Sequence, residues 1–226
     1  HGLSSHGPAR NCGCVANEDC ASDGCDARKQ CAETRSCVPI AGGRTCGQGE
    51  VGSADAMHES CCLSLPVPGM TTRLAKYKVT AGRMRAFVER VGGGVRGWYE
   101  ANKDRLTEKQ VAQIEPFVDK LPVDTSEVNY QLGGAIILPD RPSTLHGCFT
   151  GSAANRANGA HTYWTPPEVD VPPSDREDRG FDQGFLDRLP LNCVPYPILA
   201  AFCAWDGGRV QTFEENSASY GPGLYP

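Results

Sequence analysis

The sequence has no long apolar run and no excess of positive charge. No hydrophobic stretch approaches the roughly 20 residues that a membrane-spanning helix needs, and the mean hydropathy is −0.39. The net charge is −5 at pH 7, so the chain lacks the basic surface that binds nucleic acid or anionic lipid. We therefore expect neither a membrane span nor nucleic-acid binding.

The sequence also lacks paired C-x-x-C motifs, although cysteine is abundant. Of its 12 cysteines, nine lie within the first 62 residues. Their irregular spacing, with no histidine at ligand distance, disfavours zinc and favours a disulfide framework in a secreted protein, either extracellular or periplasmic. We expect nearly all of the cysteines to be oxidised, and the candidates are Cys12, Cys14, Cys20, Cys25, Cys31, Cys37, Cys46, Cys61, Cys62, Cys148, Cys193 and Cys203.

The composition changes near residue 60. Residues 1–60 are rich in Gly, Ser, Asp and Cys and poor in large apolar residues, so we expect a loop-rich module that cross-links hold together. The adjacent Cys61 and Cys62 are expected to bond to separate partners, because a ring between neighbours strains the peptide. Residues 61–226 are expected to form an irregular α+β domain with few helices, long loops and scattered strands.

Local patterns predict the first regular elements of this second domain. A short strand or turn is expected at residues 63–69, and alternating apolar and basic residues predict a strand over residues 74–79. Thr80 is expected to cap a helix that runs through Val91 and stops at three successive glycines.

Two further helices are predicted. Thr107 and Gln110 form a capping-box pattern for a helix that Pro116 should end or kink. An apolar helix is expected from about Pro197 to Trp205, where an Asp-Gly-Gly sequence ends it. Residues 121–190 are expected to be mostly irregular.

Two stretches, "YKVTAGRMRAFVE" and "LPLNCVPYPILAAFCAWDGGRVQTFEEN", resemble motifs of the formylglycine-generating enzyme (sulfatase-modifying factor) family. In that family Y-E-V-T-N precedes a helix, and D-A-x-A-F-C-x-W later precedes G-G-R-L-P-T-E-A-E-W. The matching residues are Tyr77, Val79, Thr80, Phe87, Val88, Pro190, Asn192, Val194, Ala201, Phe202, Cys203, Trp205, Gly207, Gly208, Arg209, Thr212 and Glu215. The resemblance implies a C-type-lectin-like fold for the second domain.

The chain departs from this family in two respects. Pro195 and Tyr196 stand where the family has Ser-Trp, and the L-P-T-E-A-E-W motif is altered at Val210, Gln211, Phe213, Glu214 and Asn216. The sequence ends at "GLYP", where family members continue into a second half. The copper-binding cysteine pair and most calcium ligands of the family lie in that half, so the resemblance assigns no catalytic residue here.

The residues of the second motif are expected to act mainly as scaffold. Phe202 and Trp205 should be buried, the Gly207–Gly208 pair should supply the exit turn, and Arg209 is expected to pair with Glu215 across that turn. Thr212 belongs to the same strip of the motif. Cys203 is expected to be inert, either free or bonded to Cys193, Cys148 or Cys62.

Metal-binding candidates are weak. The chain begins with His1 and has no basic-then-apolar leader, so we expect a processed chain whose N-terminal His1 is a copper candidate. A set of carboxylates could gather around calcium but lacks the spacing of a dedicated loop, which favours a solvated acidic loop: Asp170, Asp175, Glu177, Asp178 and Asp182. The aromatic Tyr163, Trp164 and Tyr196 fit either a contact surface or the core.

Two functions remain open from the sequence. The first is a secreted, non-catalytic scaffold that binds a protein or glycan, or a second chain that completes the domain. The alternative, which the resemblance implies, is part of a copper-dependent oxidase that converts a substrate cysteine to formylglycine. Calcium and copper are the candidate cofactors, and the missing cysteine pair favours the non-catalytic hypothesis.

Overall fold

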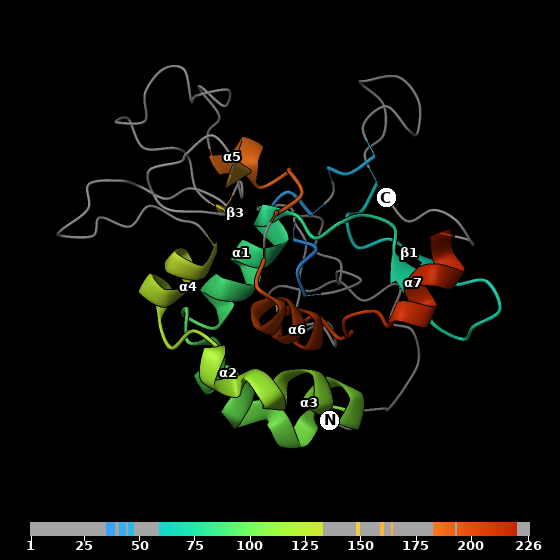
Figure 1. Ribbon diagram of the computed structural model, residues 1–226. Coiled ribbons are helices and arrows are strands. Elements are labelled where there is room, and N and C mark those ends of the chain that lie inside the picture. The colour runs from blue at the N-terminus through green and yellow to red at the C-terminus, as the bar shows by residue number, and fades with distance from the viewer. Residues whose placement is uncertain are drawn as a thin grey trace, which may run out of the picture.

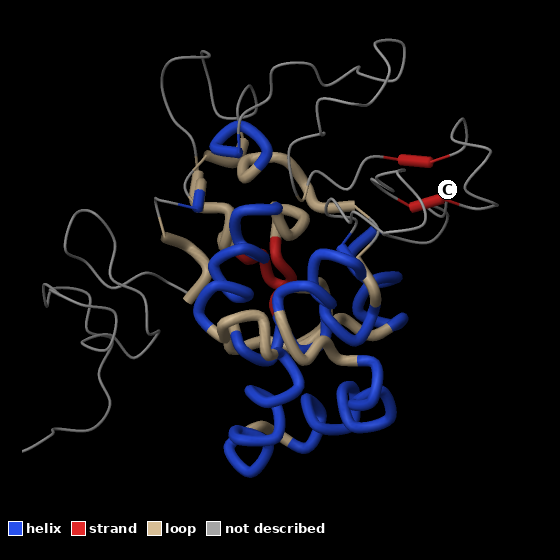
Figure 2. Tube along the Cα trace, turned by 90° about the vertical axis from the view of Figure 1, so that its left-hand side faces the viewer, coloured by secondary structure: helices blue, strands red, loops and turns tan. Residues whose placement is uncertain are grey.

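Helices make up most of the chain that the structure describes, and its strands are short (Figure 2). The computed structural model describes residues 35–38, 41–43, 45–47, 59–132, 148–149, 159–160, 164, 183–192 and 194–220. Strand β1 (Ser64–Pro66) pairs antiparallel with β2 (Arg73–Ala75), and β3 (Cys148–Phe149) pairs antiparallel with β4 (Gly159–Ala160). The chain is thus α+β, and in its described part no helix is long and apolar enough to cross a membrane.

The three predicted helices are confirmed. The helical elements are α1 (Ala81–Arg90), α2 (Val95–Asn102), η3 (Lys103–Arg105), α3 (Glu108–Ile114), η4 (Glu115–Lys120), α4 (Thr125–Leu132), α5 (Gln183–Leu186), α6 (Tyr196–Trp205) and α7 (Phe213–Tyr220). The Thr80 side chain accepts a hydrogen bond from the Arg83 amide at the start of α1. A capping box of Thr107 and Gln110 begins α3, which ends as expected just before Pro116.

Other local predictions need correction. The strand expected over residues 74–79 ends at Ala75, and Thr80 forms an isolated bridge with Pro190 instead of extending it. Helices α4 and α5 lie in the stretch expected to be mostly irregular. Helices α2 and α7 were also not predicted. The formation of α2 depends on packing against α6 more than on a continuous apolar pattern.

Helix α6 lies at the centre of the molecule, with α1 on one side and α2 and α3 on the other (Figure 1). Its sequence is apolar all round, as expected for a helix surrounded by others. Phe202 and Trp205 are 1% and 4% exposed, which confirms their predicted burial. The Phe87 ring of α1 lies 6.0 Å from Phe202 and 5.3 Å from Trp205, and it meets Trp98 of α2 at 5.7 Å.

The end of α6 also follows the sequence prediction. Gly207 has φ of 87°, a left-handed conformation that glycine adopts without steric cost, and it turns the chain away from the core. The assignment to a C-type-lectin-like fold and the division into domains at residue 60 remain predictions.

Candidate functional site

Two disulfides join residues of the cysteine-rich part of the chain to the adjacent cysteines at positions 61 and 62. Cys37 bonds to Cys62 and Cys46 bonds to Cys61, with Cα–Cα distances of 6.1 and 5.1 Å. The adjacent cysteines therefore have separate partners, as predicted. We call the described residues 35–47 and 59–62 the disulfide-bonded segment.

A buried ion pair between two helices is hydrogen-bonded to this segment. The Arg83 guanidinium of α1 lies 2.8 Å from a carboxylate oxygen of Asp206, which follows α6, and the two side chains are 5% and 7% exposed. Arg83 also donates to the Ser36 hydroxyl and to the Cys61 carbonyl. Ser36 in turn donates to Asp206 through both its amide and its hydroxyl. Every charged group in this cluster is thereby paired and hydrogen-bonded, as burial requires.

The segment approaches α1 closely at Gly82. A Cβ atom at this position would lie 2.0 Å from the Ala41 carbonyl oxygen, so a larger residue would push the two apart. On the same side, the Gly82 amide donates to the Asp187 carbonyl at 3.0 Å. Glycine thus lets two distant parts of the chain meet on one turn of α1.

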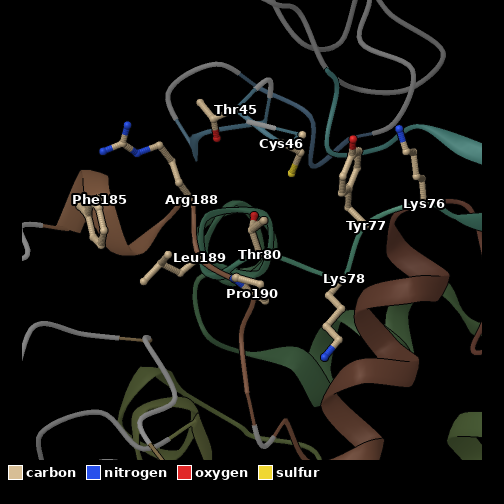
Figure 3. Close-up of a pocket in the computed structure, with 11 residues that line it drawn as sticks. Thr45, Cys46, Lys76, Tyr77, Lys78, Thr80, Phe185, Arg188, Leu189 and Pro190 are labelled. Atoms are coloured by element: carbon tan, nitrogen blue, oxygen red, sulfur yellow. The ribbon is translucent and has the colours of Figure 1, made fainter. Parts of the chain in front are cut away.

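A pocket of about 530 Å³ opens beside this contact, where three stretches of chain meet (Figure 3). Residues 45–47 come from the disulfide-bonded segment, residues 76–80 lead into α1, and residues 185–190 follow the start of α5. The lining residues are Thr45, Cys46, Gly47, Lys76, Tyr77, Lys78, Thr80, Phe185, Arg188, Leu189 and Pro190. A volume of this size is typical of small-molecule sites, which span about 300–1,000 Å³.

The walls of the pocket are held in place by the fold. The Thr80–Pro190 bridge joins two of the stretches, and the Cys46–Glu59 bridge stands beside the Cys46 disulfide. The Arg85 guanidinium of α1 donates to the Asp187 carboxylate at 3.0 Å, which holds residues 185–190 against α1. A site whose walls are fixed in this way loses little conformational entropy when it binds.

One wall carries a charged hydrogen-bond cluster. The Lys76 ammonium and the Tyr77 hydroxyl both donate to the same Glu59 carboxylate oxygen, at 2.8 and 2.6 Å. These bonds lower the pKa of Glu59, and the bond to Glu59 raises the pKa of Lys76. Burial, followed by the bond to Glu59, raises the pKa of Tyr77. The lysine and the tyrosine therefore remain proton donors at neutral pH.

The opposite wall carries Arg188 and an apolar surface. The Arg188 guanidinium lies 5.3 Å from the centre of the Phe185 ring, and the side chain is exposed. Figure 3 shows Arg188 on the α5 side of the pocket with its guanidinium directed away from Lys76 and Tyr77 on the other side, and Lys78 also points away from them. The pocket therefore has charged side chains on two sides, with apolar residues between them.

The predicted motif residues have structural partners. Arg209 donates to both carboxylate oxygens of Glu215, so the predicted pair is confirmed. Thr212 and Glu215 also cap the start of α7, where the Thr212 amide donates to Glu215 and the Glu215 amide donates to the Thr212 hydroxyl. The Arg209 bond, followed by the Thr212 amide, lowers the pKa of Glu215 to about 2.

Cys203 carries a free thiol on α6. Burial, with the nearby Asp206 carboxylate, raises its thiol pKa to about 12, although the Arg83 charge acts in the opposite direction. Its alternative partner Cys62 is bonded to Cys37. The thiol is thus protonated at neutral pH, which agrees with the expectation that it is inert.

The remaining candidates lie in the core, at the surface or in the part of the chain that is not described. Trp164 is buried at 2% exposure and donates to Asn129, whereas Tyr196 is 41% exposed and meets Phe117 edge-on. Among the described residues no cluster of His, Cys, Asp and Glu could hold a metal ion. Other candidates lie outside the described residues: His1, Tyr163, Asp170, Asp175, Glu177, Asp178, Asp182 and Cys193, with the side chain of Cys148.

No family model, curated protein or solved structure matches the chain. The pocket was not predicted from the sequence either. Lys76 and Tyr77 were interpreted as part of a strand, and Arg188 carries no local signal because its role depends on distant residues. The Thr212–Glu215 spacing, by contrast, is a capping-box pattern that could have predicted α7.

Proposed function

We propose that this chain is a non-catalytic binding scaffold of a secreted, disulfide-bonded protein, related in its motifs to the formylglycine-generating enzymes. The proposal includes a protein or glycan partner. Support for an oxidising compartment comes from the two disulfides, since such bonds persist mainly in secreted proteins.

The state of the cysteines carries the proposal. A copper-dependent oxidase of this kind needs thiolate ligands, because soft thiolates select Cu(I). Four described cysteines are in disulfides, and the Cys203 thiol is buried with a pKa raised to about 12. The described residues therefore do not fit a copper centre.

The fold supports a binding role in another way. Its helical core holds the walls of a pocket that opens between the disulfide-bonded segment and the start of α1. Loops placed on a rigid core can change their side chains without loss of the fold, which is how many binding proteins acquire their specificity.

The test is to give the oxidised chain Cu(I), oxygen and a peptide that contains C-x-P-x-R. We expect mass spectrometry to find no aldehyde, while a synthetic aldehyde-bearing peptide in a parallel sample confirms that the product is detected. Turnover by this chain alone would overturn the proposal. A Cys203→Ser variant then shows whether the free thiol on α6 is the copper ligand.

A further inference from the structure

We propose that the pocket binds an anionic group, namely a carboxylate, sulfate or phosphate carried by a small ligand. The inference goes beyond the protein or glycan binding proposed above, because it assigns a small anionic ligand to the pocket.

The charges of the residues that line the pocket favour an anionic ligand. Three lining residues are cations, Lys76, Lys78 and Arg188, and none is a carboxylate. This is unusual in a chain of net charge −5. Glu59 is the carboxylate that reaches the wall, and it bonds to Lys76 and Tyr77. The pocket and its contacts therefore keep a net positive charge, which concentrates anions in a partly enclosed space.

The positions of the hydrogen-bond donors around the pocket also support anion binding. Lys76 and Tyr77 already bind one carboxylate oxygen, that of Glu59, so this wall has the geometry to bind an oxyanion. Arg188 lies on the other wall, where its guanidinium lies over the Phe185 ring. Within the described part of the chain, Arg188 has no carboxylate within ion-pair distance. Arg188 can offer two parallel N–H bonds to a carboxylate, sulfate or phosphate group.

The floor of the pocket indicates the rest of the ligand. Leu189, Pro190 and the Cys46 disulfide offer apolar surface between the two charged walls. Such a surface suits the carbon body of a small acid better than a fully hydrated inorganic ion. A ligand with a charged end and a compact carbon body satisfies both parts of the pocket.

The first experiment titrates the full oxidised chain with sodium acetate, sulfate and phosphate at constant ionic strength. Two-dimensional amide NMR should show saturable shifts confined to residues 45–47, 76–80 and 185–189. The relative affinities of the three ions distinguish a carboxylate ligand from a sulfate or phosphate ligand. Shifts that do not saturate, or that spread over the whole surface, would overturn the proposal.

Variants then test the two walls. Arg188→Gln should weaken binding about fivefold, as expected for an exposed charge, whereas Lys109→Gln on α3 removes the same charge far from the pocket and should change little. Glu59→Gln removes the competing carboxylate and should strengthen binding about threefold. Equal effects of Arg188→Gln and Lys109→Gln, or weaker binding in Glu59→Gln, would contradict the proposed site. Arg188→Lys, which keeps the charge, should retain part of the affinity.

An acidic stretch of the chain itself is a competing anion. It includes Asp175, Glu177 and Asp178 and precedes α5 in the sequence. If saturable binding occurs only after these residues are changed to amides, the pocket's occupant is this stretch and the small-ligand proposal is wrong. This outcome would contradict the small-ligand proposal but not the non-catalytic role. Conversely, turnover of the C-x-P-x-R peptide would contradict the non-catalytic role but not the saturable anion binding.

Discussion

The disulfide-bonded segment and the helical core of α1, α2, α3 and α6 are held by different forces. The segment's buried apolar cluster consists of cysteines, and two disulfides and the Cys46–Glu59 bridge cross-link it internally. Hydrogen bonds of Ser36 and Cys61 attach it to the Arg83–Asp206 ion pair. The helical core instead buries large side chains such as Phe87, Phe202 and Trp205 against each other. The segment therefore depends on redox state and charge, and the core depends on apolar packing.

Truncation of the helical core should have the largest effect. Trp205→Ala removes a side chain that is 4% exposed and in contact with Phe87, so it should lower the free energy of unfolding by roughly 3–5 kcal/mol. Urea unfolding followed by circular dichroism measures this. Tyr196→Ala on the same helix is the control, because Tyr196 is 41% exposed and should cost less than about 1 kcal/mol. Similar costs for both variants would contradict the central position of α6.

Breaking the Arg83–Asp206 ion pair, to which the disulfide-bonded segment is hydrogen-bonded, comes next. Arg83→Met leaves the Asp206 carboxylate buried without its guanidinium partner, so it should cost about 3–4 kcal/mol. The double variant Arg83→Met, Asp206→Leu removes both charges and should recover much of this loss in the same unfolding assay. If the double variant is as unstable as the sum of its two single variants, the charges do not interact as described.

Removing one disulfide tests the segment alone. The variant Cys46→Ala, Cys61→Ala opens a link with a sequence separation of 15, which should cost about 3 kcal/mol. A reducing agent should destabilise the wild type and have a smaller effect on this variant, because one link is already absent. Unfolding of both proteins with and without reductant measures the difference. A wild-type stability that does not depend on reductant would contradict the comparison of the two regions.

The smallest expected effect concerns the Arg209–Glu215 pair, which lies outside both regions. The folded pKa of Glu215 is about 2, below its ordinary value of 4.5, so its contribution is present above pH 4.5 and is lost as the pH falls toward 2. Glu215→Gln should therefore be less stable than the wild type at pH 7 by about 1–2 kcal/mol.

Unfolding of the wild type and Glu215→Gln at several pH values tests this loss. The gap between them should close as the pH falls from 4.5 toward 2. Glu214→Gln, at an exposed position beside it, should show a much smaller dependence on pH. A gap that stays constant with pH would show that the carboxylate charge is not responsible.

Predictions from the sequence succeeded where the signal is local. Thr80, Thr107 and Pro197 each lie at the start of a helix, where capping or a fixed backbone angle acts within a few residues. Helix α2 was missed because it begins at Gly94 without a side-chain cap and buries only Val95 and Tyr99. Such a short helix is stabilised mainly by the helices that it packs against.

The sequence by itself determined that α6 is apolar, that glycines end it, and that the clustered cysteines are expected to form cross-links. Each of these features depends only on residues that are close together in the sequence. Only the tertiary structure decided which partners Cys61 and Cys62 take, and that Arg83 meets Asp206 across 123 positions of the chain. The pocket belongs to this second group. Its walls come from three separate stretches, and their contacts depend on how the whole chain packs, which no local pattern encodes.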